Sequence, residues 1–259
     1  MKTTKIILII LLTFLGSGYL PAQEYKVQVP DTKDRKLILI DFSGDLPIEG
    51  YSGNEVIFTS ASEAFTPPEK AKGLKPVYPG GTDNSGMGLS VQKNVGQITV
   101  TCLVPFTRKG EYKIRVPDNM ALEIKSGCER SSNISVSSMK NEIDIENCHG
   151  IDLKNVSGPL ILSTIAGDIN ITFDTFVTEK PSSISSVSGD IDITLPAKTA
   201  TNIEMGTING GFYSDFDISD SQKDMKRVGG NHLNASLNGG GFKFSIETVN
   251  GNIYLRKGN

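Results

Sequence analysis

The chain has 259 residues, a formal net charge of −3, two histidines and three cysteines. A mildly acidic chain without a basic cluster argues against nucleic acid and against anionic lipid as partners, because both are bound through Lys and Arg. Three cysteines are too few for a disulfide-framed miniprotein, and a chain of this length buries a core without one.

The first 22 residues have the order of a secretory signal peptide. Lys2 and Lys5 precede an apolar run over residues 6–15, and small residues lead to Ala22. That run is too short for a bilayer core, which needs roughly 20 apolar residues. We therefore expect cleavage after Ala22 and export to the periplasm, the cell surface or the medium. An uncleaved membrane anchor is the alternative, and we expect no membrane span after cleavage.

The N-terminal third predicts strands of uneven spacing. Apolar residues alternate with polar ones over 37–39, 56–58, 98–104 and 112–116, which is typical of strands with one buried face. Residues 66–88 are rich in Pro and Gly and predict a loop. We expect this region to form an irregular N-terminal cap on the more regular structure that follows.

A short phrase built around glycine recurs through the chain and predicts a repeat architecture. Its copies are FSGDLPI at 42–48, CHGIDL at 148–153, IAGDINI at 165–171, VSGDIDI at 187–193, INGGFYS at 208–214 and VNGNIYL at 249–255. The residues two before each glycine, from Cys148 onward, lie 17, 22, 21 and 41 positions apart. The shorter intervals fit one coil of a β-solenoid each. The doubled interval is interpreted as a polar, irregular excursion over 215–231. A strand over 232–237 then rejoins the sheet with its register shifted by one residue.

Glycine suits the turn in each phrase, and the Ile-x-Ile pattern after it suits a strand with one buried face. Residues 120–259 contain no helical period, so the predicted class is all-β. Two interior ladders are expected, formed by Ile169, Ile191, Phe212 and Ile253 and by Ile171, Ile193 and Leu255. The outward residues between them share one face: Asp152, Asn170, Asp192, Tyr213 and Tyr254.

Four segments, residues 38–48, 112–127, 187–196 and 237–255, are similar to the bacterial putative-adhesin family of β-strand-repeat domains. The resemblance implies a single parallel β-solenoid domain over residues 23–259. It further implies a β-helix wound right-handed, like the pectate-lyase-type solenoids, in an exported protein without enzyme activity.

The positions of the three cysteines predict that one is buried and that the other two are neighbours in space. Cys102 lies on the apolar side of an alternating strand, where a thiol packs as a small hydrophobe. Cys128 and Cys148 occupy the same slot of consecutive coils. A coil spacing of about 4.8 Å falls within the Cα separation of roughly 4.4–6.8 Å that a disulfide requires. The sequence is compatible with two alternatives for this pair, a disulfide bond and two stacked free thiols.

Groups with catalytic chemistry are scarce. His149 and His232 have no partners at metal-ligand spacing, and no nucleotide or nucleophile motif occurs, so neither a metal nor a cofactor is expected. Asp168 and Asp190 follow glycine in consecutive coils and would stand close together. Paired carboxylates can hydrolyse glycosides, and solenoids host polysaccharide enzymes, but aspartate after glycine also caps backbone amides in turns. No arginine lies between positions 131 and 226 to clamp a substrate.

The sequence therefore favours a non-catalytic binding or adhesion module of the cell envelope that recognises a glycan, a peptide or a protein. The candidate binding residues are Tyr213, Tyr254, Asp192 and Asn170, with the two tyrosines expected two coils, or about 10 Å, apart. Two alternatives stay open: a carbohydrate-active solenoid enzyme that uses the aspartate pair, and a signalling accessory of the envelope. The tyrosines also have a structural interpretation, as covers for neighbouring strands.

Overall fold

The computed structural model describes residues 23–30, 32, 34–60, 69–74, 77–105, 111–176, 179–218 and 231–258. Within these residues the chain forms twenty strands and one 3-10 turn, η1 (Glu69–Ala71). The expected signal peptide lies outside them, as do parts of the predicted loop at 66–88 and of the excursion at 215–231. No helix in the described ranges is long and apolar enough to cross a membrane.

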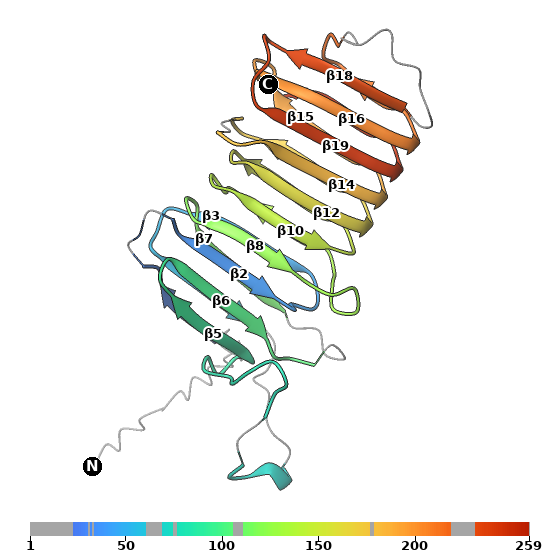
Figure 1. The fold of residues 1–259 in the computed structure, drawn as a ribbon. Coiled ribbons are helices and arrows are strands. Elements are labelled where there is room, and N and C mark those ends of the chain that lie inside the picture. The colour runs from blue at the N-terminus through green and yellow to red at the C-terminus, as the bar shows by residue number, and fades with distance from the viewer. Residues whose placement is uncertain are drawn as a thin grey trace, which may run out of the picture.

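The strands form two ten-stranded sheets that pack face to face (Figure 1). Sheet A consists, in spatial order, of β1 (Gln23–Gln28), β4 (Glu55–Ser60), β7 (Tyr112–Pro117), β3 (Leu46–Tyr51), β9 (Ile134–Ser137), β11 (Ile151–Val156), β13 (Ile169–Phe173), β15 (Ile191–Pro196), β20 (Ile253–Gly258) and β17 (Phe212–Ser214). Sheet B consists of β18 (Asn231–Leu237), β16 (Thr201–Asn209), β19 (Lys243–Asn250), β14 (Ser182–Ser188), β12 (Leu160–Ala166), β10 (Ile143–Asn147), β8 (Ala121–Lys125), β2 (Lys36–Ile40), β6 (Gln97–Cys102) and β5 (Leu89–Asn94).

From β8 to β15 the chain alternates between the sheets, so that each coil contributes one strand to each. Neighbouring coils pair in parallel, for example β10 with β12 in sheet B and β11 with β13 in sheet A. Antiparallel pairs occur only near the ends of the described sheets, where β1 pairs with β4, β4 with β7, β5 with β6, and β16 with β18. The predicted all-β, largely parallel solenoid is confirmed.

The core lies between the sheets and is built from in-register ladders. In sheet A, Ile151, Ile169, Ile191 and Ile253 pair in that order, and all four are fully buried. Phe212 follows Ile253 at the edge and is only partly buried. Period-two alternation turns every second residue inward, so one apolar position per strand produces a continuous buried column. Ile171, Ile193 and Leu255 pair in the same way and are buried, so both predicted interior ladders are present.

The order of the last coils differs from the predicted order. The coil formed by β19 and β20 lies between the coil of β14 and β15 and the coil of β16 and β17, although it comes last in sequence. The doubled sequence interval thus has a physical origin: the chain builds the outer coil first and then returns to fill the place inside it.

The strand predicted over 232–237, shifted by one residue relative to the preceding coils, is also placed differently in the structure. It pairs antiparallel with β16 at the edge of sheet B. In this register Leu237 lies opposite the buried Thr201 and is itself buried, whereas His232 lies opposite Gly206 and is exposed. A register shift in a parallel coil is therefore the wrong description of this strand.

The N-terminal end has the same out-of-order arrangement. The coil of β2 and β3 lies between the coil of β6 and β7 and the coil of β8 and β9. The predicted irregular cap thus contains two complete coils, covered by the antiparallel strands β1, β4 and β5. Cys102, at the end of β6, is free and buried, as its alternation predicts, and this burial raises the pKa of its thiol.

The turn glycines allow the coils to approach closely. Gly189 has φ of +143°, and a Cβ atom there would collide with the carbonyl oxygen of Gly167 in the preceding coil. At Gly251, the equivalent position of the next coil in space, a Cβ would collide with the carbonyl oxygen of Gly189. The recurring glycine is therefore a requirement of backbone packing between coils.

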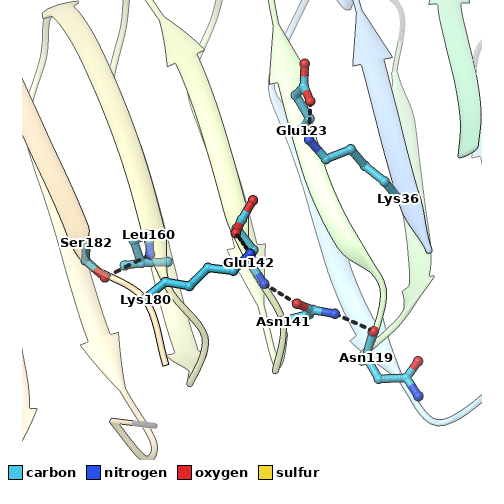
Figure 2. Close-up of polar contacts among 8 residues, drawn as sticks. All are labelled: Lys36, Asn119, Glu123, Asn141, Glu142, Leu160, Lys180 and Ser182. Carbon is cyan, nitrogen blue, oxygen red and sulfur yellow. Dashed lines mark hydrogen bonds and ion pairs between the residues drawn. The ribbon is translucent and has the colours of Figure 1, made fainter. Parts of the chain in front are cut away.

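At the opposite turn edge, polar side chains link different coils, and the longest of them reaches past the coil of β12 (Figure 2). Asn141 donates from Nδ2 to the carbonyl of Asn119 (2.8 Å) and accepts at Oδ1 from the amide of Glu142 (2.7 Å). Lys180 then pairs with Glu142 at 2.8 Å. Both turn edges are thus fixed by contacts between coils, which leaves the two outer sheet faces as the extended surfaces of the molecule.

Candidate functional site

The five outward residues singled out in the sequence lie in one row across the outer face of sheet A. The register pairs Asp152 with Asn170, Asn170 with Asp192, Asp192 with Tyr254, and Tyr254 with Tyr213. They belong to five neighbouring strands, β11, β13, β15, β20 and β17. Strands of one sheet lie about 4.8 Å apart, so the row is an array of regularly spaced side chains.

The two tyrosines are nearest neighbours, and the predicted separation of two coils is wrong. Their ring centroids are 5.2 Å apart and the ring planes differ by 17°, which is a stacked pair. The cause is the insertion of β20 beside β17, which removes the coil assumed between them. Tyr213, on the edge strand, is 56% exposed. The pair thus forms an aromatic platform at the end of the row.

Arg256 joins this platform and was missed in the sequence. Its guanidinium binds Asp192 through two atoms, with Nε–Oδ1 at 2.7 Å and Nη2–Oδ2 at 2.8 Å, and its Cζ lies 5.6 Å from the centroid of the Tyr254 ring. An exposed ion pair adds little to stability. Its main effect is to hold a planar donor group beside the aromatic ring. The signal was available, because Arg256 lies two residues after Tyr254 and alternation places both on one face.

The rest of the row is polar and internally bonded. Asn170 donates from Nδ2 to Oδ1 of Asp152 at 2.9 Å. Partial burial, the negative charge of Asp190 and the neighbouring Tyr213 raise the pKa of the Tyr254 phenol. Tyr254 therefore stays a neutral hydroxyl, able to donate and accept hydrogen bonds, at any physiological pH. Together these groups offer an aromatic surface beside several fixed donors and acceptors.

The aspartates considered for catalysis act on the backbone of the neighbouring coil. Asp168 accepts at Oδ1 from the amide of Asp190 (2.9 Å), and Asp190 accepts at Oδ1 from the amide of Asn252 (2.7 Å). Asn252 accepts in the same way from the amide of Gly211 (3.0 Å). This ladder of side-chain caps at one turn edge favours the structural interpretation of the pair over the catalytic one.

Cys128 and Cys148 are joined in a disulfide, with Cα atoms 5.2 Å apart. The bond closes a sequence separation of 20 residues between the turns that follow β8 and β10. His149 and His232 lie on different coils, and no group of three or more His, Cys, Asp or Glu side chains within the described ranges has an arrangement that would hold a metal ion.

The family model described as Toastrack DUF4097 matches residues 10–256. This chain belongs to the Toastrack family. The match covers both sheets, from β1 to most of β20, so the family resemblance seen in the repeat phrases extends over the whole described fold. No curated protein matches the chain.

Solved structures similar to this Toastrack chain include one described as a "putative cell adhesion protein" from Clostridium sporogenes. It is 14% identical, with a TM-score of 0.49, and the alignment covers 92% of this chain and all of that one. A "putative adhesin" from Bacteroides fragilis is 10% identical, with a TM-score of 0.41, over 91% of this chain and 96% of that one. A third, also a "putative adhesin", from Parabacteroides distasonis, is 13% identical, with a TM-score of 0.23, over 92% and 97%.

Proposed function

We propose that this Toastrack chain is an exported, non-catalytic binding module of the bacterial cell envelope. It recognises an external glycan, peptide or protein through the outer face of sheet A. The observation that carries the proposal is the stacked pair of Tyr213 and Tyr254 beside the Arg256–Asp192 pair, at the end of an in-register polar row. Tyrosine offers a large, rigid contact area at low entropic cost, and a fixed guanidinium adds directional hydrogen bonds.

The binding proposal is tested with the double variant Tyr213→Ala/Tyr254→Ala. Purified protein is applied to arrays of neutral and polyuronic bacterial glycans and of extended peptides. We expect the variant to lose most of the wild-type binding while its thermal unfolding stays cooperative. Val187→Ala/Ile208→Ala is the matched control, because these side chains are 48% and 60% exposed on the outer face of sheet B. An equal loss in the control, or none in the tyrosine variant, contradicts the proposal.

Export is part of the same proposal and has its own test. The order of charged, apolar and small residues over positions 1–22 supports it. We expect the intact mass of the exported protein to correspond to a chain that begins at Gln23. A mass that retains Met1 to Ala22 contradicts it.

The finer architecture is also proposed. Residues 23–259 are taken as one domain wound in the right-handed sense, like the pectate-lyase-type β-helices. Its support is general: a strand, a crossover and a second parallel strand in one sheet are nearly always connected right-handedly. An experimental structure of the mature chain tests the hand directly.

A further inference from the structure

A second feature of sheet A lies near its N-terminal end and is separate from the tyrosine platform. A groove of about 560 Å³ runs over β7, β3, β9 and β11, with Ser135, Ser137 and Pro47 among the residues that line it. The outward residues of β9 are two serines, whose short side chains form the floor of the groove. Longer side chains rise on both sides, Lys113 and Arg115 from β7 and Lys154 from β11. The hollow thus follows from short side chains between two long walls.

The walls of this groove are cationic. Within the part of the chain that the structure describes, the ammonium groups of Lys113 and Lys154 have no ion-pair partner, and both residues are exposed. Arg115 lies 3.8 Å from Glu49 and 4.3 Å from the centroid of the Tyr51 ring, with about half of its side chain exposed. The Asp152 carboxylate already accepts the hydrogen bond from Asn170. Three cations face two carboxylates in a chain whose net charge is −3.

The spacing of the cations indicates the shape of a complementary ligand. β7 and β11 are separated by β3 and β9, which places the two walls about 14 Å apart, or three strand spacings. A single small anion reaches only one wall. A ligand that satisfies both walls carries negative charges at separated points along its length, and between them it crosses the serine floor, whose hydroxyls both donate and accept hydrogen bonds.

We propose that this groove binds a linear acidic glycan, one that carries carboxylates along a chain of hydroxyl-bearing sugars. The inference rests on the proposed function, because it names a ligand class for the outer face of sheet A. An extended peptide is disfavoured because β3, β9 and β11 are each paired on both sides. They offer no free backbone edge, so a peptide cannot add as a strand and its amides would lie unpaired on side chains.

The test measures binding of an oligogalacturonate, long enough to span the groove, by isothermal titration calorimetry on the full mature chain. The groove variant is Lys113→Gln/Lys154→Gln. The control is Lys93→Gln/Lys198→Gln, which removes the same charge at exposed lysines outside the groove. We expect the groove variant to lose affinity by about tenfold or more, the control to keep it, and added salt to weaken wild-type binding.

Each other outcome overturns the inference. Absence of oligogalacturonate binding by the wild type rejects the ligand class, and equal losses in both variants reject the groove as the site. Binding of a poly-glutamate peptide with the same dependence on Lys113 and Lys154 shows that the partner is an acidic peptide. If array binding depends on Tyr213 and Tyr254 but not on the lysines, the groove fails and the proposed function stands. If neither pair matters, both fail.

Discussion

The middle of the solenoid and its two ends are built from the same strands but connected differently. Between β8 and β15 each coil pairs with the coils before and after it in sequence. At the ends, the coil of β2 and β3 and the coil of β19 and β20 are each enclosed by coils that are distant in sequence. A stack built strictly in order holds its terminal coils on one side only. Here the first and last complete coils are held on both sides, and antiparallel strands lie at three of the four described sheet ends, while β17 forms the fourth.

The largest expected effect comes from removing residues 242–259, which contain β19 and β20. These strands bury Phe244, Ile246, Ile253 and Leu255. At about 1.5–3 kcal/mol for each buried side chain, the loss is about 6–12 kcal/mol, comparable with the whole stability of a domain. Because β16 pairs with β19, we expect hydrogen exchange to show lost protection in 201–209 as well as a fall in overall stability.

A matched deletion sharpens the comparison. Removal of residues 23–30 takes away β1, whose only strand neighbour in the described sheets is β4. We expect exchange protection of the middle coils to survive this deletion. Equal damage from the two deletions would contradict the distinction between an enclosed coil and an edge strand.

The disulfide is expected to have the next largest effect. Cys128→Ser/Cys148→Ser releases a constraint over a separation of 20 residues, and we expect unfolding in denaturant to become easier by about 3 kcal/mol. Alkylation of the unfolded, non-reduced wild type is the control. One adduct is expected, on Cys102, and three adducts would show that the bond is absent.

A turn glycine in the middle is expected to cost less. Gly189→Ala places a Cβ against the carbonyl of Gly167 at a φ that L-residues rarely adopt, so we expect a loss of about 1–3 kcal/mol. Gly206→Ala is the control, because a Cβ there meets no atom closer than 3.7 Å. Similar melting curves for the two variants would show that the close packing of neighbouring coils does not require glycine at position 189.

The smallest expected effect concerns the amide ladder in the enclosed last coil. Asn252→Ala removes the acceptor for the Gly211 amide, and we expect a loss of about 1 kcal/mol in chemical denaturation. Asn170→Ala removes only an exposed side-chain contact on the sheet face and is expected to change stability little. A larger effect at Asn170 would mean that the face, and not the turn edge, holds the coils together.

The sequence predicted the features that depend on short-range pattern. Alternation identified the inward ladder from Ile169 to Ile253 and the outward row from Asp152 to Tyr254, because side-chain direction in a strand has a fixed period of two. The order of the coils was not predictable in this way. An Ile-x-Ile strand pairs equally well with any other, and the choice of neighbour is made by contacts between residues far apart in sequence.

The candidate site shows the same division. The face shared by Tyr213 and Tyr254 was predicted, whereas their distance was wrong because it depended on coil order. The cationic groove gave no signal in sequence, since Lys113 and Lys154 are 41 positions apart and form no basic cluster. Its depth comes from the short side chains of β9, which matter only once β7, β3 and β11 lie beside it.

The enclosed last coil bears on when the molecule can fold during its synthesis. A growing chain normally folds from its N-terminus as it emerges. Here the strands β16 and β17 leave the ribosome before β19 and β20, although their final place lies outside them. β16 can pair with β18 once residue 237 has been made, but the outer coil gains its inner neighbour only with β19 and β20. The docking of the outer coil onto the rest of the solenoid therefore waits for the synthesis of the two strands that lie between them.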